Sequence, residues 1–368
     1  MGRRLVLVCA LALVLAPAAG AAPWLRLGFD DDTLKWLTRP NGLVGAQQQL
    51  GAPFTRLTIP YRRGWVSLRP VVKVYLDRAQ RAAELHQKVV LAVYGDARDA
   101  PLDAISRKHY CTYVHAVLKR VPGFAAVVIW NEANSPRYWP QGPAAAGDYE
   151  ALLARCYDAL HATWPTMNVI DSTASHYDPA SFILEMGDAY RASGRDRPIV
   201  DNFGHNPYPD YASEPPWATH PGTGTIGEGD YTTLLAAITQ AFQGTAQRVP
   251  SATWARIWYL EDGFQTAPPR ALSRFYRGHE NDTTALAPDA QAAQLTAAIE
   301  LAYCQPAVSG FFNFTLLDET RLVGWQSGLF YKNGARKPAF TAFQAVAAKV
   351  AARAIDCSQV EGAPATTP

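Results

Sequence analysis

Two glutamates stand at the ends of apolar runs that lie far apart in the chain. The run Ala125–Trp130 leads through Asn131 to Glu132, and the run Arg256–Leu260 leads to Glu261. Such runs are typical of buried strands, where a carboxylate is costly unless it has a function. Retaining glycosidases use two carboxyl groups about 5–5.5 Å apart, one as proton donor and one as nucleophile. The pair therefore indicates an enzyme that cleaves glycosidic bonds.

Eight apolar runs predict the strands that must position these glutamates. They are expected at Leu25–Phe29, Phe54–Ile59, Val89–Tyr94, Ala126–Asn131, Asn168–Ser172, Ile199–Phe203, Ile257–Glu261 and Gly310–Phe314. Segments with helical periodicity lie between them, with apolar faces at Tyr110, Val114, Val117 and Leu118, at Leu153, Cys156, Tyr157 and Leu160, at Leu295, Ala298, Ile299 and Ala302, and at Phe340, Phe343, Val346 and Val350. Eight strand–helix units in series predict an α/β fold, a single (β/α)8 TIM barrel. An open doubly wound sheet is the alternative, but no glycine-rich phosphate-binding motif follows a strand to support it.

The residues around both glutamates carry a family resemblance. Trp130-Asn131-Glu132-Ala133-Asn134 resembles the W-N-E-P-N signature of clan A glycoside hydrolases, and residues 259–263 resemble the nucleophile motif of that clan. The resemblance runs along most of the chain and is nearest to family 39-like and cellulase-like proteins. It implies that Glu132 is the acid/base, that Glu261 is the nucleophile, and that Asn131 binds the sugar 2-hydroxyl. Ala133 replaces the usual proline, which should alter local stiffness rather than chemistry.

Four more residues match the clan by position. Arg56, on the second strand, resembles the arginine that supports the nucleophile, and such a guanidinium would hold Glu261 as a carboxylate. A purely structural ion pair at the barrel mouth is the alternative for Arg56. His205 and Tyr208 end the sixth strand, where the clan often places residues that contact substrate or nucleophile, and the alternative for His205 is packing. Trp325 follows the eighth strand, where an indole can stack on a sugar ring or simply pack. Trp139, after the fourth strand, has the same two interpretations.

Three consecutive carboxylates, Asp30, Asp31 and Asp32, follow the first strand. Hard oxygen ligands of this kind can bind calcium or magnesium. Capping of the next helix by Asp31 or Asp32 is the better interpretation, because a side-chain oxygen there accepts from free backbone N–H groups. Asp31 can still reach a sugar hydroxyl and is kept as a candidate substrate-binding residue. We expect no metal and no cofactor.

The first residues have the pattern of a secretory signal peptide. Arg3 and Arg4 precede the apolar stretch Leu5–Leu15, and small residues at 19–21 suit cleavage. The predicted organisation is a signal peptide at 1–21, a glycoside hydrolase-like barrel at 22–357 and a disordered tail at 358–368. An uncleaved anchor is the alternative, although the apolar stretch is too short to span a bilayer by itself. We expect an exported protein, extracellular or periplasmic.

Four cysteines lie in the predicted barrel, and none of them forms a zinc-binding pattern. Cys111 and Cys156 fall in the helices on either side of the strand that leads to Glu132, and Cys304 and Cys357 end the last two helical segments. In an exported protein these pairs predict two disulfides. Free buried thiols are the alternative.

Composition limits the choice of partner. The net charge of +2 gives no electrostatic reason to bind nucleic acid or an anionic membrane. The chain is 48% apolar with ten Trp and 17 Tyr, which suits a large core and faces for sugar rings. We expect a monomer that hydrolyses an extracellular oligo- or polysaccharide by double displacement. A non-catalytic glycan-binding protein on the same barrel and a transglycosidase of cell-surface polysaccharide assembly remain alternatives.

Overall fold

The computed structural model of the chain describes residues 25–280 and 282–364. The predicted signal peptide and the last residues of the predicted tail lie outside this range. The strands are β1 (Arg26–Asp30), β2 (Phe54–Pro60), β3 (Lys88–Tyr94), β4 (Phe124–Ile129), β5 (Val169–Ile170), β6 (Thr173–Ala174), β7 (Phe203–Asn206), β8 (Ile257–Asp262) and β9 (Val308–Phe314). The α-helices are α1 (Thr33–Trp36), α2 (Asn41–Gln49), α3 (Pro70–Glu84), α4 (Ala104–Arg120), α5 (Ala145–His161), α6 (Pro179–Ala192), α7 (Tyr231–Phe242), α8 (Pro288–Tyr303) and α9 (Pro338–Ala352).

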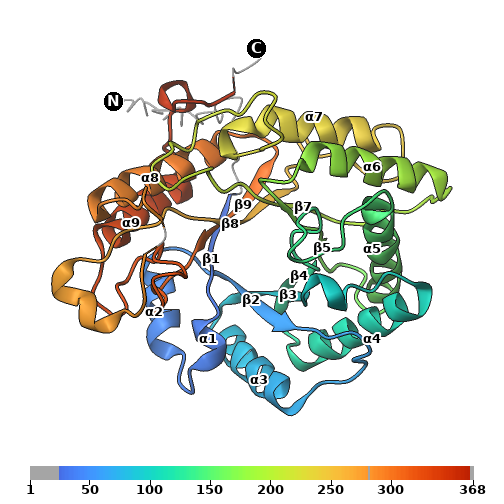
Figure 1. Cartoon of the computed structure of the whole chain (residues 1–368), viewed down its shortest axis with the longest axis horizontal. Coiled ribbons are helices and arrows are strands. Elements are labelled where there is room, and N and C mark those ends of the chain that lie inside the picture. Colours follow the sequence, from blue (N-terminus) through green and yellow to red (C-terminus); the bar gives the residue numbers. More distant parts are fainter. Residues whose placement is uncertain (1–24, 281, 365–368) are drawn as a thin grey trace, which may run out of the picture.

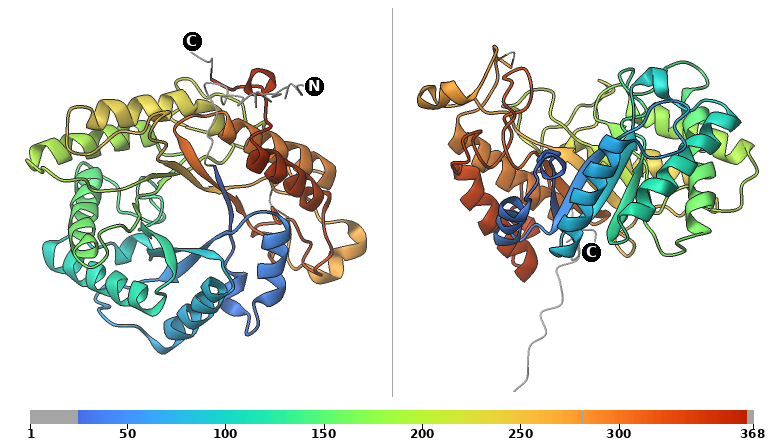
Figure 2. Two further views of the ribbon diagram at one scale, coloured as in Figure 1. Left: turned by 180° about the vertical axis from the view of Figure 1, so that it is seen from behind. Right: turned by 90° about the horizontal axis from the view of Figure 1, so that it is seen from below.

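A single parallel sheet forms the centre, and the helices form a ring around it (Figure 1). Its strand order is β5-β4-β3-β2-β1-β9-β8-β7-β6, so the two strands at its ends are neighbours in sequence. Seen from behind, the helices follow one another around the ring in chain order (Figure 2). An isolated parallel bridge between Ile170 and Asn202 joins β5 to the residue just before β7, on the other side of the opening. The fold is therefore the predicted (β/α)8 barrel, with its fifth strand divided into β5 and β6.

The division of the fifth strand has a local cause. Between β5 and β6, the Asp171 carboxylate accepts the backbone N–H of Gly204 at 2.7 Å, and Ser172 N–H is bound by the Tyr149 hydroxyl at 3.0 Å. These side-chain bonds replace ladder bonds at this point. A Cβ atom on Gly204 would lie only 2.1 Å from the Asp171 carbonyl oxygen, so the close approach of the two strands requires glycine.

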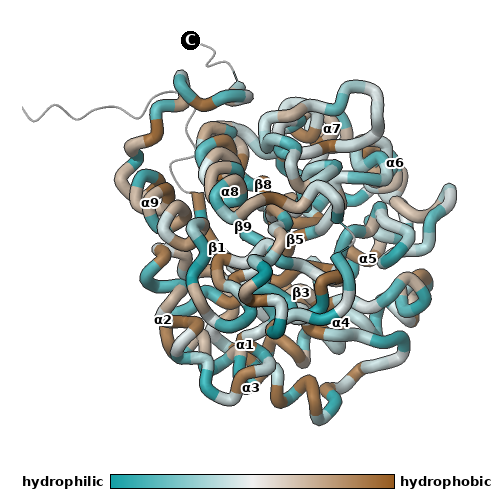
Figure 3. Tube along the Cα trace, turned by 60° about the vertical axis from the view of Figure 1, so that its left-hand side comes forward, coloured by the Kyte–Doolittle hydropathy of each residue, from teal (hydrophilic) through white to brown (hydrophobic). Residues whose placement is uncertain are grey.

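Two apolar layers follow from the alternation of side chains along the strands. The inside of the barrel is filled by Val90, Ala92, Ala126, Val128, Ile170, Trp258, Leu260 and Phe312. A much larger cluster lies between the sheet and the helices and includes the four helical faces predicted from periodicity. Apolar and polar stretches alternate along the outer helices, as expected for helices with one face on a core (Figure 3).

Both predicted disulfides are confirmed by the structure: Cys111 is bonded to Cys156, which joins α4 to α5, and Cys304 to Cys357. Beyond Cys357 the chain forms a short 3-10 turn, and Val360 and Ala363 pack against the outer core. For 365–368, disorder stays a prediction. No helix in the described ranges is both long and apolar enough to cross a membrane.

Candidate active site

Glu132 follows the end of β4, and the side-chain alternation of the strand breaks just before it. Val128 points into the barrel, but Ile129 and Trp130 both pack in the outer core. Trp130 has φ of 68° and Glu132 has φ of 42°, conformations that non-glycine residues rarely adopt. Such conformations persist only where the surroundings fix them, and they cluster at functional sites.

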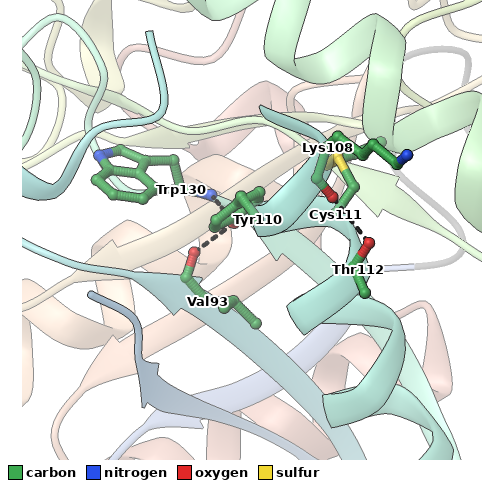
Figure 4. Close-up of a disulfide and its surroundings, with 7 residues drawn as sticks. Val93, Lys108, Tyr110, Cys111, Thr112 and Trp130 are labelled. Atoms are coloured by element: carbon green, nitrogen blue, oxygen red, sulfur yellow. Dashed lines mark hydrogen bonds between the residues drawn. A yellow bond between two sulfur atoms is a disulfide. The ribbon is translucent and has the colours of Figure 1, made fainter. Parts of the chain in front are cut away.

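The helices on either side of β4 hold this backbone in place. From α4, the Tyr110 hydroxyl donates to the Val93 carbonyl at 2.6 Å and accepts from Trp130 N–H at 3.1 Å, next to the Cys111 disulfide (Figure 4). From α5, the Tyr149 hydroxyl donates to the Ile129 carbonyl at 2.8 Å. The disulfide thus ties together the two helices that anchor the turn carrying Glu132.

A strand irregularity aims Glu261 at the same place. Leu260 points into the barrel, so regular alternation would turn Glu261 outward toward the helices. The pairing of β8 with β9 shifts register between Tyr259 and Asp262, which is the signature of a β-bulge. Glu261 consequently points into the barrel mouth, where it lines the cleft and is only 8% exposed.

Arg56 is the centre of a buried polar network below the cleft. Its Nη1 contacts Asp30 Oδ2 and donates to Glu261 Oε1 at 2.6 Å, while Nη2 donates to Asn131 Oδ1 at 2.7 Å. Burial alone would lower the pKa of Arg56, but the carboxylates of Asp30 and Glu261 outweigh it and raise that pKa. One permanently charged guanidinium therefore joins β1, β2, β8 and the segment after β4, and it faces carboxyl groups that are largely shielded from water.

Glu132 has a different environment. Burial raises its pKa to about 7, and the negative charge of Glu261 adds to this, while a hydrogen bond from Asn206 and the charge of Arg56 oppose it. Near neutral pH a substantial fraction of Glu132 is therefore protonated. A carboxyl group that keeps its proton near neutral pH is what a general acid requires.

The end of β7 supplies a contact to each glutamate. Asn206 Nδ2 donates to Glu132 Oε1 at 2.8 Å, and the Tyr208 hydroxyl donates to Glu261 Oε2 at 3.2 Å.

His205 does not line the cleft: Nδ1 pairs with Thr173 Oγ1 at 2.9 Å and Nε2 with the Ile226 carbonyl at 2.8 Å. Burial lowers the pKa of His205 to about 4. The expectation that His205 binds substrate is therefore replaced by its packing role, because both ring nitrogens are engaged inside the protein.

The cleft above these groups has a volume of about 850 Å³. Trp325 lines it and is 36% exposed, with its ring 5.0 Å from that of Tyr208 and 5.2 Å from that of Phe314. Trp139, in contrast, is fully buried, packs against Trp130 and donates its Nε1–H to a backbone carbonyl. Of the two tryptophans, only Trp325 is placed to stack on a sugar.

The three aspartates at the end of β1 have separate partners. Asp30 contacts Arg56, and Asp32 pairs with Lys35 and accepts the N–H of Thr58. Asp31 accepts three backbone N–H groups, from Thr33 at 2.7 Å, from Leu316 at 2.8 Å and from Leu317 at 2.9 Å. Its oxygens thus join the loops after β1 and β9; Asp31 also lines the cleft, and its contact with a sugar stays a prediction.

Sequence reasoning did not single out Asp30 and Asn206. Asp30 was visible only as one of three adjacent carboxylates, and its position opposite Arg56 in the β1–β2 register is what distinguishes it. Asn206 was visible as part of Asn206-Pro207-Tyr208, but its side-chain direction depends on where β7 ends.

Comparisons with known proteins place this geometry among glycosidases by fold. No family model matches the sequence, and no curated protein matches it. Among solved structures, a family 39 glycoside hydrolase from the gut symbiont Bacteroides cellulosilyticus WH2 is similar with a TM-score of 0.64 and 16% identity, over 89% of this chain and 64% of that one. The chain has the fold of the clan A glycoside hydrolases.

Two other solved structures show the same fold. A GH5_18 variant from Streptomyces cattleya, in complex with Manb1-4GlcNAc, has a TM-score of 0.58 and 16% identity, over 88% of this chain and 80% of that one. A β-glucuronidase from Bacteroides uniformis has a TM-score of 0.53 and 13% identity, over 88% of this chain and 35% of that one. The present chain thus spans less than two thirds of the family 39 enzyme and about a third of the β-glucuronidase.

Proposed function

We propose that this protein is a retaining O-glycosidase that cleaves an oligo- or polysaccharide outside the cytoplasm. The observation that carries the proposal is the pair of glutamates at one cleft with opposite surroundings. Glu132 sits where burial and a neighbouring negative charge favour the acid form. Glu261 accepts hydrogen bonds from Arg56 and Tyr208, which suit a carboxylate nucleophile.

Each residue then has a defined step. In the first, a Glu261 oxygen attacks the anomeric carbon, the bond to the leaving oxygen breaks, and Glu132 gives that oxygen its proton. In the second, the Glu132 carboxylate takes a proton from water, and the water oxygen displaces Glu261 from the anomeric carbon. Arg56 and Tyr208 stabilise Glu261 as it regains its charge, which supports departure from the intermediate.

The cleft suggests how a sugar is held. Its volume lies in the upper part of the range of small-molecule pockets, about 300–1,000 Å³, and it is open at the top of the barrel. Trp325 offers an aromatic face in the lining of the cleft, while Asn131 is 2% exposed and lies beside Arg56. We assign Asn131 to the sugar 2-hydroxyl on the strength of the motif that it shares with the clan.

Export is part of the proposal. Two disulfides persist in oxidising compartments and are rare in the cytosol, and the first residues have the pattern of a signal peptide. An extracellular or periplasmic location would bring the protein to its glycan. Mass spectrometry of the protein from the culture medium or periplasm tests this directly, with a mature chain starting near residue 22 as the expected result.

The test of activity is a panel of aryl glycosides and polysaccharides offered to the wild type and to Glu132→Gln and Glu261→Gln. Glu185, exposed on the outer face of α6, provides the matched control Glu185→Gln. Cleavage by the wild type and the control, with at least about a thousandfold loss in Glu261→Gln, supports the proposal. Tight glycan binding without cleavage by any of the four proteins would instead establish a binding protein, and transfer to an added sugar acceptor would establish a transglycosidase.

A further inference from the structure

The long loop between β7 and α7 brings together three potential metal ligands outside the carboxylate pair. One oxygen each of Asp210 and Glu214 and one ring nitrogen of His220 all lie within 4.8 Å of one another. The residues are ten positions apart along the loop from first to last, and the loop folds back to assemble them. Nothing in the proposed glycosidase chemistry uses this group.

His220 is oriented as a metal-binding histidine is. Its side chain is 8% exposed, and its Nδ1 lies 2.7 Å from Asp230 Oδ2. Asp230 also accepts the backbone N–H groups of His220 and Gly227, so its carboxylate is fixed. Accepting from Nδ1–H, Asp230 leaves Nε2 as the free ring nitrogen. A carboxylate behind the ring is the usual outer contact of a histidine ligand.

The free nitrogen points at the two carboxylates without being satisfied by them. Nε2 of His220 lies 3.2 Å from Glu214 Oε2 and 3.9 Å from Asp210 Oδ2, yet it has no hydrogen-bond partner within the described part of the chain. The other oxygen of Asp210 is taken, because it lies 3.0 Å from Nε2 of His176. Three donor atoms therefore converge on one point.

The spacing suits a tetrahedral dication. Ligand atoms about 2.0–2.1 Å from zinc at the tetrahedral angle are about 3.3 Å apart. The two separations that involve His220 are 3.2 and 3.9 Å, and that between the two carboxylate oxygens does not exceed 4.8 Å. Side-chain movements of at most about 1.5 Å would bring all three to the value for zinc. One imidazole nitrogen with carboxylate oxygens favours zinc or another first-row transition metal over calcium, which prefers an all-oxygen set.

No lysine or arginine is among the described residues that line the small cavity next to His220. Glu214 and His220 line a small cavity of about 10 Å³ together with Glu228 and Asp262. Both carboxyl oxygens of Glu228 and Oδ2 of Asp262 are buried without hydrogen-bond partners among the residues described. A dication at the edge of this cavity would offset the cost of burying these acidic groups.

We propose that Asp210, Glu214 and His220 bind one divalent transition-metal ion, with zinc as the best fit and water as the fourth ligand. Asp230 orients His220 from behind. The ion would fix the loop that starts at Tyr208, the residue that contacts Glu261, and would hold Asp210 at the cleft wall. It is a structural site beside the cleft and takes no part in bond cleavage.

The test measures the affinity and stoichiometry of zinc binding to the mature protein, by competition with a chromophoric chelator. The wild type is expected to bind one zinc per chain, reversibly on addition of EDTA, with a rise in Tm on binding. His220→Ala should weaken binding at least a hundredfold and abolish the Tm rise. Asp230→Asn should weaken it about 10- to 100-fold, as loss of an outer contact does. His279→Ala, at an exposed histidine away from the loop, is the control and should bind as the wild type does.

Several results would overturn the proposal. These are less than one zinc per chain in the wild type, zinc binding that His220→Ala leaves unchanged, or stoichiometric binding of calcium with none of zinc. If His220→Ala does not fold, Glu214→Gln gives the same test from another ligand. A histidine that is merely protonated between two carboxylates would show no metal binding and counts against the site. None of these readouts needs turnover, so they stand apart from the glycosidase assignment.

Discussion

Replacing Arg56 by methionine removes the only cation of the network below the cleft while keeping most of the side-chain volume. Asp30 is 4% exposed and Glu261 is 8% exposed, so both carboxylates lose their counter-charge in a place that water hardly reaches. Removing one partner of a buried ion pair costs about 3–5 kcal/mol. We expect a loss of that size in the free energy of unfolding at pH 7, together with loss of glycosidase activity.

The loss should depend on pH with a definite sign. In the variant, folding at pH 7 must either bury charged carboxylates or protonate them, and each pH unit of acidification lowers the cost of protonating one by about 1.4 kcal/mol. The difference in unfolding free energy between wild type and variant should therefore shrink by about 2–3 kcal/mol between pH 7 and pH 5. Urea denaturation of the wild type and the variant at both pH values measures this difference in unfolding free energy.

A matched control comes from the surface. Arg120 pairs with Asp77, and both side chains are 48% exposed, so Arg120→Met should leave the free energy of unfolding nearly unchanged at either pH. The reasoning fails if Arg56→Met is as stable as this control at pH 7. It also fails if the loss is the same at pH 5, because the cost would then not come from stranded carboxylates.

Three further predictions concern Glu132, its hydrogen bond from Asn206, and the disulfide between α4 and α5. Glu132 must be protonated to act as acid, and its pKa is about 7, so kcat/KM should fall about tenfold per pH unit above pH 7. Glu132→Gln should lack this alkaline limb of the pH–rate profile on activated aryl glycosides. Asn206→Ala removes the hydrogen bond that favours ionised Glu132, so pH–rate profiles should show the limb about one unit higher. Cys111→Ser with Cys156→Ser opens a link across 45 residues, and chemical denaturation should show a loss of up to about 4 kcal/mol.

The barrel and its disulfides were predictable because periodicity and cysteine placement are local signals. The faces read from α4, α8 and α9 are buried as expected. The sixth strand was misplaced by several residues: Ile199–Phe203 was expected, and β7 is Phe203–Asn206. The N–H groups of Ile199 and Val200 both bond to Gln247 Oε1 instead of to a neighbouring strand. No pattern in residues 199–203 could reveal that distant side chain.

The directions of the active-site side chains were less predictable from the sequence than their positions at the ends of the strands. Strict alternation predicts that Glu261 faces outward, and only the bulge in β8 turns it into the cleft. The left-handed conformations at Trp130 and Glu132 likewise break the regular alternation after β4. Which of His205, Asn206 and Tyr208 meets a glutamate likewise depends on where β7 ends. These features arise from pairing between distant segments, which sequence spacing does not encode.

The most direct test of the central claim is to locate the covalent intermediate. The wild type is incubated with the 2-deoxy-2-fluoro analogue of a glycoside that it cleaves, carrying a good leaving group, and is then digested and analysed by tandem mass spectrometry. We predict one added glycosyl group per chain, carried by Glu261, and none in Glu261→Gln. A protein that turns over the parent glycoside but carries the sugar on another residue, or forms no adduct and releases a product of inverted configuration, would contradict the assignment of Glu261 as nucleophile.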